Sequence, residues 1–85
     1  MSGDLQAISG KDLIRLLQKD GWEILRISPH GIALRKYDTN AGRMRVTTIP
    51  KRSGSLPPGT LGSILSPKQT GLGRKGLSEL IARLK

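Results

Sequence analysis

The first regular pattern in the chain is a stripe of apolar residues at helical spacing. Ser9 and Asp12 have the spacing of a capping box, which favours the start of a helix directly after Ser9. Gly21 can take the left-handed conformation that commonly ends a helix. The pattern therefore predicts a helix over about residues 10–20. Its expected buried face consists of Leu13, Ile14, Leu16 and Leu17.

Three short segments rich in strand-forming residues come next, at 22–27, 32–37 and 43–49. The stretches between them, 28–31 (SPHG) and 38–42 (DTNAG), contain the proline, glycine and Asx residues that favour tight turns. Because strands joined by short turns pair as neighbours, we expect a three-stranded antiparallel meander.

The third of these segments alternates apolar and basic residues. Met44 and Val46 occupy one set of positions, and Arg43 and Arg45 occupy the other. Since successive side chains of a strand point to opposite faces, we expect an apolar face that packs on the first helix. The other face is expected to be basic and to lie in water.

Two further helices are expected after the strands. Pro50 cannot donate to a strand ladder and ends the third strand, whereas Pro58 suits the first turn of a helix that reaches about residue 65. A flexible connector over 66–74 is expected to lead to a last helix over 75–84. The apolar stripe of that helix consists of Leu77, Leu80, Ile81 and Leu84.

The predicted order of elements is α-β-β-β-α with an extra C-terminal helix. This order describes an α+β fold in which a three-stranded antiparallel sheet packs on helices. A chain of 85 residues is long enough for one domain, so we expect a single domain over 1–85 with its core within 8–65.

The charge of the chain points to a polyanionic partner. Fifteen lysines and arginines against six acidic residues give a net charge of +9. Residues 26–75 hold ten of these bases and a single acid, Asp38. A basic excess of this kind is typical of nucleic-acid-binding proteins. The bases expected to contact phosphates are Arg26, Arg35, Lys36, Arg43, Arg45, Lys51 and Arg52.

Cysteine is absent and histidine occurs once, which narrows the candidate chemistry. A disulfide framework and a Cys-ligated zinc site are excluded, and the basic segment offers too few ligands for a metal nuclease centre. We therefore expect neither a metal nor a small-molecule cofactor. No apolar run is long enough to span a bilayer, and the N-terminus lacks the layout of a signal peptide. We expect no membrane association and a cytoplasmic location.

Two other patterns carry less weight. Residues 71–76 (GLGRKG) match the dinucleotide-binding fingerprint as a string, but no predicted strand precedes them, so we reject that interpretation. A linker or a phosphate contact stays open for this segment. Trp22 and Tyr37 are the only aromatic residues, too few for a base-stacking platform, and we expect Trp22 to pack in the core.

His30 is the one side chain of the type that exchanges protons near neutral pH. RNA supplies its own nucleophile, the 2′-hydroxyl, so a single general acid or base in a cationic environment can suffice for its cleavage. A lone histidine in a turn is usually an ordinary polar residue. The surrounding bases add support for the catalytic interpretation and leave both interpretations open.

Four stretches resemble the HicA-type mRNA interferase toxins. Residues 46–50 (VTTIP) and 56–65 (LPPGTLGSIL) resemble the family's paired motif, and 9–17 (SGKDLIRLL) with 20–22 (DGW) resemble its first helix and the junction that follows. The resemblance covers about residues 8–65. It implies a fold like that of double-stranded-RNA-binding domains.

The resemblance also implies a function. It suggests the toxin of a type II toxin–antitoxin module, a metal-independent endoribonuclease that cleaves mRNA and is neutralised by a HicB-type antitoxin. The family's catalytic histidine lies in a turn before the second strand, and His30 occupies the matching place. Ser28 and Pro29 stand where that turn usually has glycine and serine.

Two alternatives remain beside the nuclease. The first is a non-catalytic module of the same fold that binds structured RNA through its shape and phosphates. The second is a protein-interaction domain whose partner is an acidic protein. Cleavage of RNA separates the nuclease from both.

Overall fold

The computed structural model describes residues 8–51 and 54–84 of the chain. The elements follow the predicted order, a helix, three strands and then two helices. They are α1 (Gly10–Lys19), β1 (Glu23–Ser28), β2 (Gly31–Asp38), β3 (Arg43–Ile49), α2 (Pro58–Ile64) and α3 (Gly73–Leu84). The α+β prediction with an extra C-terminal helix is confirmed.

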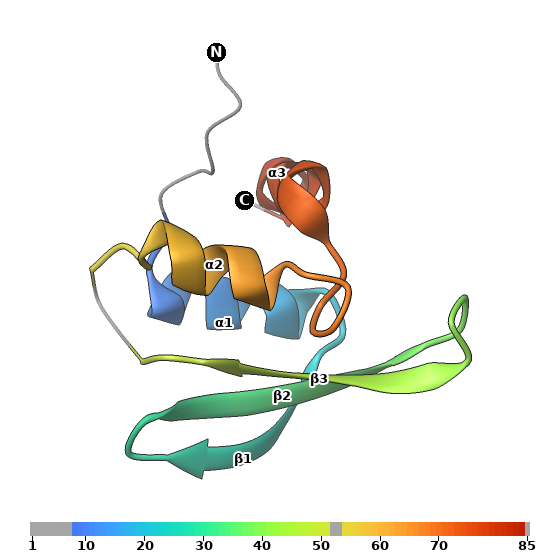
Figure 1. The fold of residues 1–85 in the computed structure, drawn as a ribbon, viewed down its shortest axis with the longest axis horizontal. Helices are drawn as coiled ribbons and strands as arrows, with labels where there is room; N and C mark the ends of the chain where they lie inside the picture. Colours follow the sequence, from blue (N-terminus) through green and yellow to red (C-terminus); the bar gives the residue numbers. More distant parts are fainter. Residues whose placement is uncertain (1–7, 52–53, 85) are drawn as a thin grey trace.

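The three strands form one antiparallel sheet in the order β1-β2-β3. Figure 1 shows α1 and α2 on one face of this sheet, above β3, while β1 lies at the edge farthest from them. The third helix, α3, lies on the side of α1 and α2 that faces away from the sheet. Within the described residues, no helix combines the length and apolarity needed to cross a membrane.

Local sequence explains the bounds of α1. The Ser9 hydroxyl accepts a hydrogen bond from the backbone N–H of Asp12 at 3.1 Å, as expected for an N-cap. Gly21 has a φ of 102°, a left-handed conformation that few other residues adopt, and it ends the helix after Asp20. Leu13 and Leu17 are fully buried.

The core lies between the helices and the inner face of β2 and β3. Trp22 belongs to it, as predicted, and is 5% exposed. Because α3 contributes two buried leucines, this helix is part of the same core. The most deeply buried apolar residues are Leu13, Leu17, Leu34, Ile49, Leu61, Ile64, Leu77 and Leu80.

The predicted orientation of β3 is wrong. Ile49 is buried and pairs with Ile32, so its face points to the helices, and Thr47, two positions before it, is buried as well. With a side-chain period of two, Arg43 and Arg45 share this inner face, while Met44 and Val46 are exposed on the outer one. One apolar residue at the end of the strand therefore decides the orientation of the whole strand.

The segment between α2 and α3 is a hydrogen-bonded turn, where the sequence predicted a flexible connector. Thr70 is buried, and its hydroxyl donates to the Ile64 carbonyl at 2.7 Å. Backbone bonds from Gly71 to Ser66 and from Gly73 to Leu65 close the turn. Consequently α3 begins at Gly73, two residues before the predicted start.

Candidate functional site

His30 lies in the tight turn between β1 and β2. Ser28 and Gly31 pair directly, so the turn consists of Pro29 and His30 alone. Neither residue has a positive φ, and proline at the first position with histidine at the second matches a type I turn. The turn holds the His30 imidazole on an exposed corner of the sheet.

Ser28 and Gly31 shape this turn. The sequence predicted a turn over 28–31, but neither the bond made by Ser28 nor the close contact at Gly31 was predicted. The Ser28 hydroxyl donates to the Gly31 carbonyl at 3.1 Å and closes the turn across its base. A Cβ on Gly31 would lie 2.6 Å from the Ile49 carbonyl oxygen, so only glycine fits where β2 begins against the end of β3. Serine at the first position and glycine at the fourth are the usual residues of a type I turn, and this signal was present in the sequence.

Two of the predicted phosphate-binding cations lie close to His30 in the chain or in the sheet. Arg26 is exposed on β1, two residues before Ser28. Lys51 is exposed and follows Pro50, whose Cα lies 3.3 Å from a Cβ built on Gly31. Among the described residues, neither cation has a carboxylate within ion-pair distance. Arg52, the third cation predicted here, lies outside the described residues.

Arg35 occupies the outer face of the sheet in the middle of β2. Its Nε lies 3.5 Å from Glu23 Oε1 on the paired strand. Both side chains are largely exposed, at 45% and 73%, so water weakens this ion pair and Arg35 can still reach an external anion.

The remaining predicted cations lie at the other end of the sheet and contact groups of the chain itself. The Lys36 ammonium donates to the Asp20 carbonyl at 2.7 Å and lies 3.2 Å from the Asp20 carboxylate. Arg83 of α3 contacts the same carboxylate at 3.0 Å. The three residues join the end of α1 to the sheet and to α3.

Arg45 and Arg43 hold the turn that precedes α3. Arg45 Nε lies 2.6 Å from the Asp38 carboxylate, and its Nη1 donates to the carbonyls of Pro67 and Gln69. Arg43 donates to the same Pro67 carbonyl at 3.2 Å. The sequence predicted that these two guanidinium groups would lie in water. In the structure they instead contact backbone carbonyls and a carboxylate of the chain.

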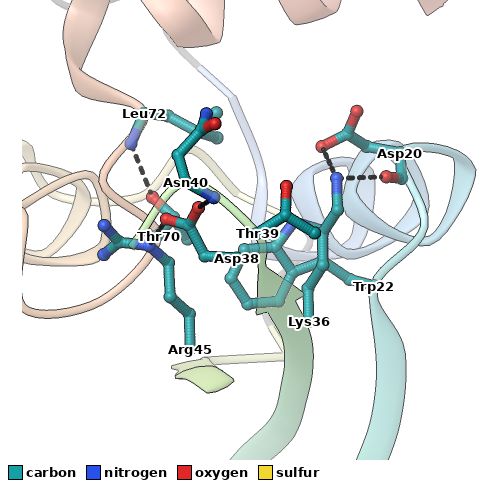
Figure 2. Close-up of a pocket in the computed structure, with 9 residues that line it drawn as sticks. All are labelled: Asp20, Trp22, Lys36, Asp38, Thr39, Asn40, Arg45, Thr70 and Leu72. Atoms are coloured by element: carbon teal, nitrogen blue, oxygen red, sulfur yellow. Dashed lines mark hydrogen bonds and ion pairs between the residues drawn. The ribbon is translucent and has the colours of Figure 1, made fainter. Parts of the chain in front are cut away.

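A pocket of about 260 Å³ opens between these ion pairs, and Trp22, Thr70 and Leu72 complete its wall. Figure 2 shows Lys36 directed at Asp20 and Arg45 directed at Asp38, with the Trp22 indole between the two pairs in this view. The two cations and two carboxylates cancel, so the lining carries no net charge for a phosphate.

Asp38 is the carboxylate most strongly affected by its surroundings. The hydrogen bond from the Arg45 guanidinium and those from the backbone of Ala41 and Asn40 hold the pKa of Asp38 below its usual value. Asp38 therefore stays ionised at neutral pH and neutralises Arg45. The same carboxylate organises the β2–β3 turn.

The sequence matches a known protein family over most of its length. The model of the family described as the HicA toxin of bacterial toxin–antitoxin systems matches residues 10–72. The chain belongs to the HicA toxin family. No curated protein and no solved structure matches the chain.

Membership of the HicA family makes the chain a toxin of a bacterial toxin–antitoxin system, with an antitoxin as its partner. The family match includes α1, the sheet and α2, and it stops at Leu72, one residue before α3 begins. In the described part of this HicA chain, no three His, Cys, Asp or Glu side chains are grouped in a way that could hold a metal ion.

Proposed function

We propose that this HicA toxin is an endoribonuclease that cleaves mRNA, with His30 as its general acid–base. One observation supports the proposal most directly. The single histidine of the chain is exposed in a closed turn, at the end of the sheet where Arg26 and Lys51 have no carboxylate partner within residues 8–51 and 54–84. A polyanion can approach this end without displacing an internal ion pair.

The proposed reaction is a transesterification within the RNA. The neutral imidazole accepts the proton of a ribose 2′-hydroxyl while the 2′-oxygen forms a bond to the adjacent phosphorus. The bond between phosphorus and the 5′-oxygen of the next nucleotide breaks, and that oxygen takes the proton from the His30 imidazolium, which regenerates the neutral imidazole. The products are a cyclic phosphate and a free 5′-hydroxyl, and neither a metal nor a protein nucleophile takes part.

The cations of this end have a separate role. Arg26 and Lys51 are placed to bind phosphates on either side of the reacting one and to stabilise the charge that develops on it. Arg52 follows Lys51 directly in the sequence and is assigned the same role. Arg35 extends the interface along the outer face.

Lys36, Arg43 and Arg45 receive a different assignment. Each of them contacts a carboxylate or a backbone carbonyl of the chain itself. Releasing Lys36 or Arg45 to bind RNA would leave the half-buried carboxylates of Asp20 and Asp38 without these partners, which costs free energy. Arg43 is exposed, and its assignment rests on its hydrogen bond to the Pro67 carbonyl. We assign these three residues to the stability of the fold.

The partners in this proposal are mRNA and a HicB-type antitoxin, and the place where both meet the toxin is the bacterial cytoplasm. The antitoxin would neutralise the toxin by covering the His30 end. Because the toxin has an excess of nine positive charges, its charge favours binding both of mRNA and of an acidic antitoxin.

Replacement of His30 by alanine tests the proposal. We expect H30A to cleave mRNA about 100- to 10,000-fold more slowly than the wild type, because proton transfer is lost. Binding of the same RNA should stay within a factor of about three, since the phosphate contacts remain. A gel assay of cleavage and a filter-binding assay measure the two quantities.

Thr39→Ala is the matched control, because Thr39 is exposed in the turn at the opposite end of β2. This variant should cleave at the wild-type rate. If H30A cleaves as fast as the wild type, His30 has no catalytic role. If the wild type binds RNA with a steep salt dependence and cleaves none, the chain is the non-catalytic RNA-binding module.

A further inference from the structure

The β1 strand is an uncovered edge of the sheet. It pairs with β2 on one side only, and five of its six residues are exposed, the sixth being half-buried. Ile24, Leu25 and Ile27 are exposed by 40%, 44% and 63%. Natural edge strands are usually short, charged or covered, because an open edge pairs with other chains.

The helices explain why these aliphatic side chains remain exposed. Ile24 pairs with Leu34 and Ile27 pairs with Ile32, so both point to the helical face of the sheet. Figure 1 shows that α1 and α2 lie over β3 and do not extend over β1. Leu25 stands at the irregularity between Ile24 and Arg26 and has no direct partner on β2.

The other edge strand, β3, differs from β1 because segments of the chain pack on its inner face. The turn that precedes α3 lies against β3, where Arg45 and Arg43 donate to its carbonyls. Thr47 donates to the Gln69 side chain at 2.6 Å. In the described part of the chain no comparable segment lies against β1.

We propose that the β1 edge binds an extended, acidic segment of the antitoxin, which adds a fourth strand to the sheet. The proposal rests on the partner named above. Strand addition supplies main-chain hydrogen bonds, while apolar side chains of the added strand cover Ile24 and Ile27. Arg26, exposed and without a carboxylate partner among the described residues, selects an acidic residue beside them.

Charge and chemistry separate this occupant from two others. A second copy of the chain would bring another net charge of +9 to the same edge, which opposes pairing of two copies. RNA has no peptide groups to continue a sheet, and three aliphatic side chains offer no surface on which bases stack. An acidic protein strand satisfies the charge, the backbone groups and the apolar side chains together.

This docking mode would couple binding to inhibition. β1 leads directly into the turn that carries His30, and Arg26 lies on the strand itself. A strand laid along β1 therefore ends beside His30 and occupies the space in which RNA phosphates would lie. Neutralisation follows from occlusion and requires no change in the toxin fold.

Substitution of the two aliphatic side chains tests the proposal. The double variant Ile24→Lys with Ile27→Lys adds charge to exposed positions of the edge, and Val46→Lys adds it to an equally exposed position on the outer face of β3. Isothermal titration of the toxin with its purified antitoxin measures binding. We expect the double variant to bind at least about tenfold more weakly and V46K to bind within about twofold of the wild type.

Binding of the double variant within twofold of the wild type would overturn the proposal, as would equal weakening by V46K. Both variants should melt cooperatively and cleave RNA at the wild-type rate, so the antitoxin measurement stands apart from the nuclease. A wild type that binds the antitoxin through β1 but cleaves no RNA would overturn the proposed activity alone.

Amide hydrogen exchange of the wild-type toxin gives a second measurement that needs no variant. The antitoxin should slow exchange of the β1 amides that do not bond to β2, by at least about tenfold. Unchanged exchange at β1 in the complex overturns the proposal. So does protection of the same amides by self-association of the toxin, which sedimentation experiments would detect.

Discussion

The two ends of the sheet carry similar cations in opposite states. At the end that holds His30, Arg26 and Lys51 are exposed and have no carboxylate partner among the described residues. At the other end, Lys36 and Arg45 contact Asp20 and Asp38 at 3.2 and 2.6 Å. The cations of the first end are available to an external anion. The cations of the second end are already paired with the carboxylates of Asp20 and Asp38.

This difference shows that a count of basic residues does not define a phosphate-binding surface. A guanidinium that already contacts a carboxylate and two carbonyls, as Arg45 does, stabilises the chain and gains little from a phosphate. Arg26 loses only hydration when it binds RNA. The partners of each cation, more than its place in the sequence, decide its role.

Substitutions at the two ends should have different effects. We expect the largest effect from a substitution in the backbone turn at the His30 end. Gly31→Ala places a Cβ 2.6 Å from the Ile49 carbonyl oxygen, so the β2–β3 junction must shift. We expect a loss of about 2 kcal/mol in the free energy of unfolding, typical of overpacking, together with reduced RNA cleavage. Urea denaturation measures the first quantity.

Gly62→Ala is the matched control for this change. No atom lies within 4 Å of a Cβ at Gly62, which is an exposed residue within α2. This variant should gain about 0.5–1 kcal/mol, because alanine is the better helix former. Equal effects of the two substitutions would show that close contact at Gly31 does not shape the His30 end.

Salt dependence of RNA binding tests the comparison directly. Lys51→Ala and Arg26→Ala should each lower the slope of log K against log salt by about 0.7, the loss of one phosphate contact with a single strand. Lys36→Ala should leave this slope unchanged and instead lower the melting temperature. Filter binding at several salt concentrations gives the slopes, and a thermal melt gives the stability.

Lys19→Ala controls for net charge in this series. Lys19 is an exposed residue at the end of α1, far along that helix from Ser9 and away from the His30 turn. The K19A substitution removes one positive charge, as K51A does, but should not change the slope of log K against log salt. A fall in slope for K19A equal to that for K51A would mean that total charge, and not the His30 end, governs binding.

The smallest expected effect is on stability at low pH, where the Asp38 carboxylate becomes protonated. Because the pKa of Asp38 is lower in the folded chain, its contribution to stability is fully present above the unfolded value of about 3.9 and is lost as pH falls through the folded value. Asp38→Asn should therefore lose less stability than the wild type between about pH 5 and pH 2. Thermal melts across this range check it, and parallel losses for both proteins would contradict the assignment.

The sequence predicted the elements well because their signals are local. The spacing of Leu13 and Leu17, the cap at Ser9 and the stop at Gly21 all act within a few residues of one another. The turn around His30 was also predictable, since serine, proline and glycine each favour their own position in it. The family motifs placed His30 in this turn as well.

The orientation of β3 could not be read from its own alternation. Met44 and Val46 suggest one inner face, whereas Thr47 and Ile49 suggest the other. The second choice prevails because Ile49 packs against the core beside Ile32. Alternate residues of a regular strand share one face, so Thr47, Arg45 and Arg43 must point to the same side as Ile49. The arginines on that face are accepted because their long side chains reach carbonyls of a turn more than twenty residues away.

By itself, then, the sequence determined the order of helices and strands, the excess of positive charge and the turn that presents the single histidine. Only the tertiary structure decided which cations are free, because Asp20, Pro67 and Gln69 meet Lys36, Arg43 and Arg45 only after the chain has folded. It also decided that the inner face of β1 is left uncovered, since the helices pack over β3. Local signals act through neighbouring residues, whereas the pairing of charges and the covering of edges depend on contacts between distant segments.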